Sequence, residues 1–287
     1  MSNEAIPAPA VLLIGGSATG KSNFLVRAWL GLRKSGQVKL IGTPEDIEYV
    51  EQGASYLMRG QFVPRTSRDA PVQNFAATVE LLEGECKGEV RQILLPDING
   101  ELWSKAVHTR EIPEEWHRRM QSAHGAILFV RLSQPSFVEP LDWVTARELL
   151  GLDSSEPFDQ YPTQVEICEL LHFLRDTMLA NNRHRKPRVA LVITAWDALP
   201  ADHGSPEDVV RKNMPMVSGL LEDQKGIEAR VFGVSIVDGD LDADADAQRR
   251  CKEDLSPLGY SVITNAEGAA EKIRDVTLPI AWVLSAP

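Results

Sequence analysis

The sequence is poor in cysteine, in long apolar runs and in net positive charge. Its three cysteines, Cys86, Cys168 and Cys251, are scattered and show no metal-ligand spacing. An odd, scattered set of this kind excludes a disulfide framework and favours a reducing compartment. No apolar stretch approaches the roughly 18–20 residues that span a bilayer. The formal net charge of −11 offers no attraction to nucleic acid or to anionic membranes.

The first ten residues lack the basic start and apolar run of a secretory signal. We therefore expect a cytoplasmic protein with no membrane span and no nucleic-acid partner. The 287 residues, of which 43% are hydrophobic, are enough for a sizeable core. We expect a flexible N-terminus over residues 1–10 and a single domain over residues 11–287.

Segments typical of strands and of helices alternate along the chain. The expected strands are 11–14, 125–132, 189–197 and, as the last one, 229–237. The expected helices are 21–34, 44–58 (started by Thr43 and Pro44), 163–180, one that begins at Ser205 and Pro206, and a closing helix from about Asn265 that Pro279 kinks or shortens. This alternation predicts an α/β fold of three layers, with a mostly parallel central sheet and helices on both faces.

One antiparallel pair is expected within this pattern. Residues 74–83 and 89–96 flank a polar turn and predict a hairpin. Two loop-rich stretches, at about 133–162 and 238–262, are expected to be insertions into the domain. The second of them opens with an acidic segment, 238–248, which is expected to be a solvated loop.

A glycine-rich motif follows the first expected strand and opens the first expected helix. It matches G-x-x-x-x-G-K-[ST] in full and consists of Gly15, Gly16, Ser17, Ala18, Thr19, Gly20, Lys21 and Ser22. The backbone N–H groups of such a loop point at phosphate oxygens, and the helix dipole favours their negative charge. Lys21 would reach the β- and γ-phosphates, and the Ser22 hydroxyl would ligate Mg²⁺. The motif alone does not separate GTPases from ATPases or kinases.

A second motif lies at the end of the expected hairpin, in the stretch ILLPDINGE over residues 93–101. Asp97 ends the strand, and Gly100 follows three residues later. An Asp at this place holds Mg²⁺, usually through water, and a Gly there lets the backbone approach the γ-phosphate. An isolated D-x-x-G is otherwise an ordinary turn, and its place after a P-loop and a hairpin favours the functional interpretation.

In this order the motifs resemble those of the TRAFAC, or Ras-like, class of P-loop GTPases. The resemblance implies a Ras-like G domain, and it implies a switch I Thr that ligates Mg²⁺. Thr43 and Thr66 both qualify by position, and Thr66 is preferred because Thr43 is expected to cap a helix. Arg65 beside it either neutralises transition-state charge or is an exposed loop residue. Glu101 stands where many relatives have the Gln that positions water, and it either orients the attacking water or is repelled by the γ-phosphate. Residues 109–120 resemble a mobile switch II helix.

The stretch LVITAWD, residues 191–197, falls where this class carries its guanine-reading element. Asp197 would accept two hydrogen bonds from the guanine N1–H and 2-amino groups, a pair that adenine cannot supply. Thr194 replaces the usual Asn of the element, and Ala195 replaces the usual Lys. A bare strand that ends in an exposed Asp is the alternative for this stretch taken alone.

Ser235, at the end of the last expected strand, matches the Ser of the class's Ser-Ala element. Ile236 replaces the Ala but keeps the backbone N–H that reads guanine O6. Two partial matches at the ends of two expected strands favour GTP over ATP as the ligand.

Taken together, the P-loop, Arg65-Thr66, D-I-N-G-E and T-A-W-D resemble the bacterial double-GTPase group, over residues 11–237. This resemblance implies GTP/GDP and Mg²⁺ as cofactors, and a GTPase-associated protein partner at a bacterial conflict or defence locus. Three functions are open at this point. The chain is a slow GTPase switch that controls a partner, a GTP-binding scaffold without useful turnover, or a P-loop ATPase or kinase.

Overall fold

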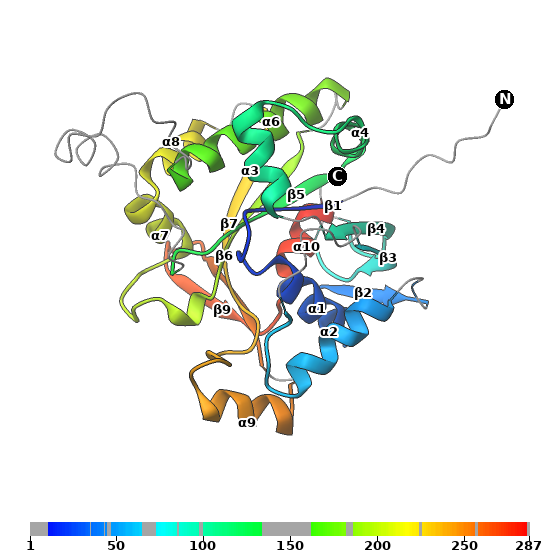
Figure 1. Ribbon diagram of the computed structural model, residues 1–287, viewed down its shortest axis with the longest axis vertical. Coiled ribbons are helices and arrows are strands. Elements are labelled where there is room, and N and C mark those ends of the chain that lie inside the picture. Colours follow the sequence, from blue (N-terminus) through cyan, green and yellow to red (C-terminus); the bar gives the residue numbers. More distant parts are fainter. Residues whose placement is uncertain are drawn as a thin grey trace.

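A computed structural model of the chain places a central sheet between two layers of helices (Figure 1). The described residues are 11–34, 36–42, 44, 47–64, 73–84, 86–97, 100–133, 162–181, 186–223, 226–255 and 258–285. Within these ranges no helix is long and apolar enough to cross a membrane.

The central sheet has six strands in the order β1-β5-β6-β7-β8-β9. Its parallel strands are β1 (Val11–Ile14), β5 (Gly125–Val130), β6 (Arg188–Thr194) and β7 (Glu228–Ser235). Two antiparallel strands extend it, β8 (Tyr260–Thr264) and β9 (Ala270–Ile273). A three-stranded antiparallel sheet is formed by β2 (Val38–Ile41), β3 (Gln73–Leu81) and β4 (Val90–Asp97). The last of these, β4, lies against β1.

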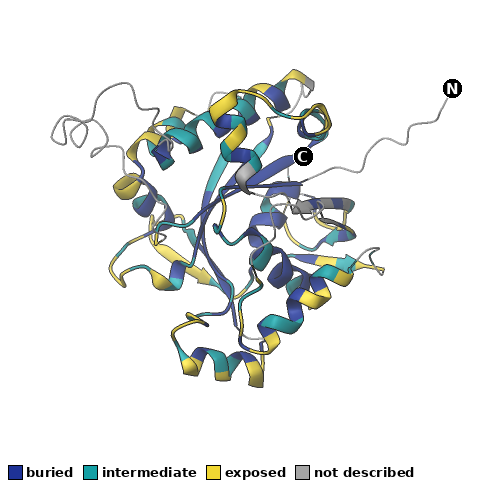
Figure 2. Ribbon diagram, in the orientation of Figure 1, coloured by how far each residue is buried: buried dark blue, intermediate teal, exposed yellow. Residues whose placement is uncertain are grey.

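The parallel strands are apolar on both faces, because each face of the sheet is covered by helices. In β1, Val11 and Leu13 enter one core, whereas Leu12 and Ile14 enter the other. Consecutive side chains of a strand point to opposite faces, so an unbroken apolar run is what a sheet buried on both sides requires. Figure 2 shows the result, with the central strands buried and the exposed residues gathered on the outer sides of the helices.

Helices divide between the two cores. One core receives α1 (Lys21–Leu32), α2 (Glu48–Met58), α9 (Ala245–Glu253) and α10 (Leu278–Leu284). The other receives α3 (Gly100–Thr109), α4 (Glu114–Ser122), α6 (Thr163–Asn181), α7 (Pro206–Asn213) and α8 (Pro215–Asp223). Because β1, β5, β6 and β7 are parallel, their carboxyl ends meet at one edge of the sheet. Loops at such an edge are where ligands bind in open α/β sheets.

The predicted α/β architecture is confirmed. The sheet is mostly parallel in its centre, and the predicted hairpin is present as β3 and β4. The helix predicted after Ser205 begins at Pro206, and Ser205 caps it reciprocally with Asp208. The hydroxyl of Ser205 accepts from the Asp208 N–H at 3.3 Å, and the Asp208 carboxylate accepts from the Ser205 N–H at 3.1 Å.

Two predictions for the N-terminal half are wrong. The helix expected from Pro44 begins only at Glu48, with Ile47 at its N-cap and Glu48 and Glu51 in its first turn. Acidic side chains in the first turn interact favourably with the positive end of the helix dipole, which stabilises a helix that begins at this point. The hairpin is also not the one antiparallel pair, because the unpredicted strand β2 pairs with β3.

The C-terminal predictions need larger corrections. The strand expected to be the last is followed by β8 and β9. In place of the closing helix expected from Asn265, the chain forms a hairpin turn, β9 and the short α10. The Asn265 side chain accepts from the N–H groups of Glu267 at 3.0 Å and Ala269 at 2.9 Å, which closes a turn that competes with helix. Pro279 lies in the first turn of α10.

The acidic segment 238–248 is not a loop throughout, because α9 begins at Ala245 within it. The Asp244 side chain accepts from the Asp246 N–H at 2.8 Å and caps this helix. In the other expected insertion, residues 134–161 lie outside the described part of the chain.

Candidate nucleotide-binding site

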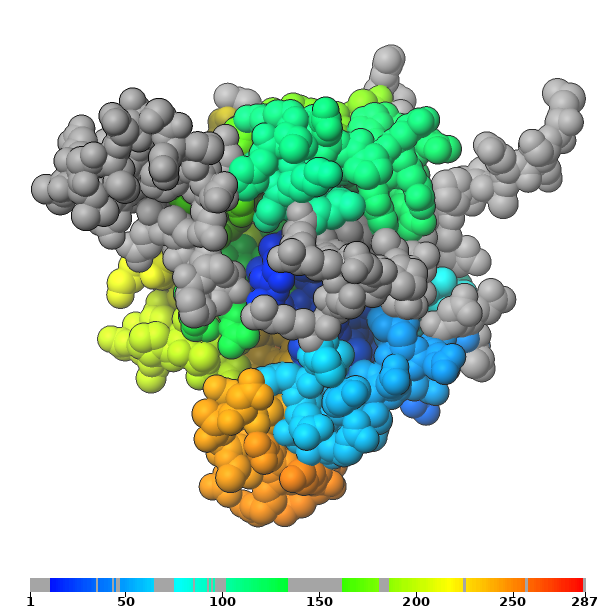
Figure 3. Space-filling view, viewed as in Figure 1, coloured from blue at the N-terminus to red at the C-terminus, as the bar shows by residue number. Residues whose placement is uncertain are grey.

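The glycine-rich loop joins the end of β1 to the start of α1, and its shape depends on residues with left-handed backbone. Ala18 and Gly20 have φ values of 60° and 91°. Gly15 lies so close to β5 that a methyl group on it would come 2.7 Å from the Phe129 carbonyl oxygen. In Figure 3, the blue chain that begins with β1 and this loop reaches the surface between the green α3–α4 region and the light-blue α2 region.

Lys21 is held at this loop by two of the loop's own carbonyl groups. Its ammonium donates to the Gly15 and Gly16 oxygens, each at 2.8 Å, and the residue is only 6% exposed. The Thr19 hydroxyl donates to the same Gly16 carbonyl at 2.9 Å. The cation therefore lies beside the N-terminus of α1, where the helix dipole adds positive potential. A group of this kind attracts phosphate oxygens.

Thr194 connects the loop to the end of β6. Its hydroxyl lies 2.8 Å from the Thr19 carbonyl oxygen and 3.3 Å from that of Val130. A hydroxyl has one proton to donate, so the shorter contact, to the loop, is the stronger. A methyl group on Gly20 would lie 3.7 Å from the Thr194 side chain, which confirms how closely the two segments pack. The structure thus places Thr194, predicted to bind the cofactor, as a buried support of the loop.

Asp197 follows β6 in a 3₁₀ turn, η1, that spans Trp196–Ala198. Ala195 has left-handed backbone at φ 50°, and this bends the chain so that Trp196 points inward. The Trp196 ring packs over Gly233 of β7, where a methyl group would lie 2.3 Å from the ring, and against His203 at a centroid distance of 4.2 Å. The indole therefore fixes the turn, and Asp197 itself is half-buried.

Ser235 and Ile236 lie at the end of β7, next to the end of β6. Ser235 is 1% exposed, and its hydroxyl accepts from the Asp238 N–H at 2.9 Å, which closes a tight turn over residues 235–238. The Ile236 carbonyl accepts from Arg27 Nε at 3.0 Å. Two predicted base-reading segments, one around Asp197 and one around Ser235, are thus neighbours at the carboxyl edge of the sheet.

Tyr260, the first residue of β8, belongs to the same edge, and no motif in the sequence predicts it. It pairs with Ser235 across the antiparallel β7–β8 register. Burial raises the pKa of Tyr260 to about 12, and the negative charges of Asp197 and Asp238 add to this shift. The Lys272 ammonium lies 3.5 Å from the centroid of the Tyr260 ring. No local signal marks Tyr260, because it lies in a stretch that was expected to be an insertion.

Two of the three predicted Mg²⁺ ligands, Ser22 and Asp97, lie in described segments of this region. Ser22 lies half-buried in the first turn of α1, and Asp97 is the last residue of β4, the strand that lies against β1. The structure describes the backbone of Asp97, Gly100 and Glu101 but not the carboxylate side chains of Asp97 and Glu101, and α3 begins at Gly100.

Arg65, Thr66 and Thr43 lie outside the described residues. The described chain that leads toward Arg65 and Thr66 runs beside the P-loop helix, because the Val63 N–H donates to Asn23 Oδ1 at 3.0 Å.

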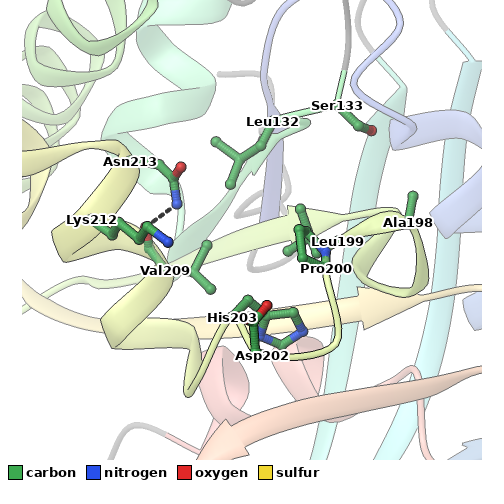
Figure 4. A pocket seen from close by; sticks show the side chains of 10 residues that line it. All are labelled: Leu132, Ser133, Ala198, Leu199, Pro200, Asp202, His203, Val209, Lys212 and Asn213. Carbon is green, nitrogen blue, oxygen red and sulfur yellow. Dashed lines mark hydrogen bonds between the residues drawn. The ribbon is translucent and has the colours of Figure 1, made fainter.

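A separate cavity of about 300 Å³ lies behind the turn that carries Asp197 (Figure 4). It is lined by Leu132, Ser133, Ala198, Leu199, Pro200, Asp202, His203, Val209, Lys212 and Asn213. The Asn213 amide donates to the Val209 carbonyl at 2.9 Å, the dashed line in the figure. None of the residues that line this cavity belongs to the glycine-rich loop, so the cavity is distinct from that loop.

Comparison with known proteins gives one family and a set of distant structures. A family model described as Double-GTPase 1 matches residues 12–283. No curated protein matches the chain. One similar solved structure is the signal recognition particle receptor SRb-GTP/SRX complex from Chaetomium thermophilum, at 15% identity and a TM-score of 0.37, with 87% of this chain and 98% of that chain covered. Another is nucleolar GTP-binding protein 1 from Plasmodium falciparum, at 9% identity and a TM-score of 0.33, with coverages of 89% and 90%.

Proposed function

The chain belongs to the Double-GTPase 1 family, and from this premise we propose that it is a Mg²⁺-dependent GTPase that acts as a nucleotide-controlled switch for a protein partner. Membership of the family supports binding and hydrolysis of GTP. The observation that carries the finer proposal is the junction at Thr194, where the glycine-rich loop and the two segments predicted to read the base meet at one edge of the sheet.

The phosphate end of the ligand would lie in the glycine-rich loop. Lys21 would share its ammonium protons between the two loop carbonyls and the β- and γ-phosphate oxygens. The N–H groups of the loop and of the first turn of α1 would receive the remaining phosphate oxygens. These contacts bind any nucleoside triphosphate, because they do not touch the base.

The base end would be read by Asp197 and by the N–H of Ile236. The carboxylate accepts from guanine N1–H and from the 2-amino group, while the backbone N–H donates to O6. Adenine has neither the N1–H and 2-amino donors nor the O6 acceptor. A half-buried carboxylate left without hydrogen-bond partners would therefore lower the affinity for ATP. Thr194 holds the loop and Trp196 holds the turn, so the Asn and Lys usual at these places are not needed for positioning.

The residues of the site fit Mg²⁺. Its ligands would be the Ser22 hydroxyl, Asp97 through water and Thr66, an all-oxygen set of the kind this ion prefers. The bound ion would neutralise charge on the β- and γ-phosphates. Hydrolysis adds water to the γ-phosphorus in line with the bond to the β-phosphate oxygen, which breaks to give GDP and inorganic phosphate. Glu101 would orient or deprotonate this water, Arg65 would neutralise transition-state charge, and the Gly100 N–H would hold the γ-phosphate.

The output would be a change at the two switches. The segment leading to Thr66 passes the P-loop helix at Val63, and α3 begins at Gly100; these two segments and α4 would be the switches that the γ-phosphate orders. A GTPase-associated protein in a bacterial conflict or anti-phage defence system would be the partner, in the cytoplasm. Hydrolysis without that partner would be slow.

Single-turnover hydrolysis with excess protein, GTP and Mg²⁺ tests this proposal. We expect release of inorganic phosphate that stops when Mg²⁺ is chelated and that is lost in Lys21→Ala. Lys39→Ala, which changes an exposed lysine of β2, is the matched control and should behave as wild type. Phosphate release that does not depend on Lys21 would contradict the proposed site.

A GTP-binding scaffold without useful turnover is the second candidate, and Glu101 in the place of the usual Gln favours it. Its carboxylate would lie near a trianionic γ-phosphate and would be repelled by it. Glu101→Gln decides between the two. Slower turnover in the variant supports a catalytic Glu101, whereas intact GTP after hours in both proteins supports the scaffold.

A further inference from the structure

Arg27 is a buried cation at the inner face of the P-loop helix. It lies about two turns after Lys21 on α1 and is only 5% exposed. Arginine is rarely buried unless its donors are satisfied, because its charge loses hydration in the interior. Burial lowers the pKa of Arg27, while the negative charge of Asp275 opposes that shift. The guanidinium must therefore be held by specific partners.

Those partners are backbone carbonyl groups from two separate stretches of chain. Nε donates to the Ile236 oxygen at 3.0 Å. Nη2 donates to the Leu258 oxygen and, at 3.4 Å, to the Leu255 oxygen. Ile236 lies at one end of the excursion that contains α9, and Leu255 and Leu258 lie at the other. One planar guanidinium thus joins both ends of this excursion to α1, a geometry that the point charge of a lysine does not reproduce.

The backbone around this contact is closely packed. Gly259 has left-handed backbone at φ 84°, and a methyl group on it would lie 2.6 Å from the Ile236 oxygen and 3.1 Å from Arg27 Nε. On the other side of Ile236, the Ser235 hydroxyl accepts from the Asp238 N–H. Ile236 is consequently fixed by Arg27 at its carbonyl and by the 235–238 turn around it.

We propose that Arg27 is a positioning residue for base recognition, which holds Ile236 so that its N–H faces guanine O6. This inference rests on the proposed function, since it concerns how the same site reads its base. Because Arg27 lies on the helix that begins at the P-loop, it also fixes the distance between the phosphate-binding loop and the base-reading turn.

The proposal separates three nucleotides by their chemistry. GTP and ITP both present O6 and N1–H, and ITP lacks only the 2-amino group that Asp197 would accept from. ATP carries an amino group in the place of O6, so it gains nothing from the Ile236 N–H. Loss of Arg27 should therefore lower the affinities for GTP and ITP by the same factor. The affinity for ATP should remain nearly unchanged.

The test is equilibrium binding of GTP, ITP and ATP to wild type, Arg27→Lys and Arg27→Met, with non-hydrolysable triphosphates and Mg²⁺ present. We expect the affinities for GTP and ITP to fall about three- to tenfold, as for loss of one hydrogen bond between neutral groups, with ATP within about twofold. Arg33→Met is the matched control, because Arg33 is an exposed arginine at the end of the same helix. It should leave all three affinities unchanged.

Gly259→Ala provides an independent perturbation that retains the Arg27 side chain. The added methyl group would push the Ile236 carbonyl away, so the same loss for GTP and ITP is expected. Cooperative thermal unfolding shows whether each variant is folded. If Arg27→Met is not folded, the binding measurements on Gly259→Ala and Arg27→Lys test the proposal.

The outcomes distinguish the inference from the function on which it rests. If the folded variants lose affinity for GTP and ATP equally, Arg27 has a general structural role and the proposal is overturned. An unchanged affinity for GTP would also overturn it. A changed GTP-to-ITP ratio would assign the effect to Asp197 instead. Wild-type protein that binds GTP and ATP equally would contradict the proposed guanine site itself, whatever the variants do.

Discussion

The two ends of the candidate site are built in different ways. The phosphate end is one continuous stretch, residues 15–22, and the hydrogen bonds of Thr19 and Lys21 to Gly15 and Gly16 remain within it. The base end is assembled from the ends of β6 and β7, the first residue of β8 and the Arg27 side chain of α1. A local motif therefore builds the first end, whereas the second depends on contacts between residues that lie far apart in the chain.

On the proposed function, this difference locates selectivity in one of the two ends. The phosphate end would supply affinity that is common to all nucleoside triphosphates, and the base end would supply discrimination. Thr194 belongs to both, because it ends the strand that leads to Asp197 and its hydroxyl donates to the loop at Thr19. Substitutions at the phosphate end should consequently lower the affinities for all nucleoside triphosphates alike. Substitutions at the base end should change the affinities for some nucleotides and not for others.

Lys21→Ala should have the largest effect, because it removes the positive charge of the phosphate end. We expect affinity to fall about 100-fold or more for GTP, ITP and ATP alike, since the lysine contacts phosphates and not the base. Titration calorimetry with each nucleotide provides the measurement, and Lys39→Ala provides the control. A loss confined to GTP would show that the two ends are not separable.

Asp197→Asn should come next and should act on the base end alone. The amide donates where the carboxylate accepts, so GTP affinity should fall roughly 10- to 100-fold while xanthosine triphosphate, which has an acceptor oxygen in the place of the 2-amino group, gains. Asp202→Asn is the matched control, because Asp202 is an exposed carboxylate of the following loop. An unchanged ratio of GTP to xanthosine triphosphate would remove Asp197 from the base site.

Thr194→Val should have a smaller effect that is shared by both ends. The change keeps the shape and removes the hydroxyl, which leaves the Thr19 carbonyl without this partner at a cost of about 1–3 kcal/mol in unfolding free energy. GTP and ATP affinities should both weaken, by up to about tenfold. Thr177→Val, at a buried threonine of α6 in the opposite core, should not change either affinity. Loss of GTP binding alone would make Thr194 a direct base contact.

Tyr260→Phe should give the smallest effect, visible only at high pH. The pKa of Tyr260 is about 12 in the folded protein against an ordinary value of 10.0, so the folded state favours the neutral phenol. That contribution is fully present below pH 10 and is lost between about pH 10 and 12. Wild type should therefore lose stability more steeply than the variant over this range in chemical denaturation. Parallel curves would mean that the phenol is not buried beside Asp197 and Asp238.

The phosphate end could be predicted from the sequence because its determinants are contiguous. Gly15, Gly20 and Lys21 are where the spacing requires them, and the structure needs glycine at Gly15 for the close approach of β5. The alternation of buried strands and helices likewise predicts the sheet, because a parallel sheet covered on both faces requires unbroken apolar strands.

The base end could be predicted only in part. Asp197 and Ser235 are found at strand ends, but Arg27, Gly259 and Tyr260 acquire their roles only through folding, and no spacing relates them. Thr194 was expected at the ligand because it replaces an Asn, and the structure directs its hydroxyl to the loop instead. The closing helix predicted from Asn265 is wrong because the Asn265 side chain closes a turn, after which β9 pairs with β8.

The most direct test of the two-ended site is the ratio of GTP to ATP affinity in the wild-type protein, measured by competition against one fluorescent nucleotide in the presence of Mg²⁺. We expect GTP to bind at least about tenfold more tightly than ATP, because its base presents groups that match the donor and acceptor of the proposed site. Equal affinities, or a preference for ATP, would show that Asp197 and Ile236 do not read the base.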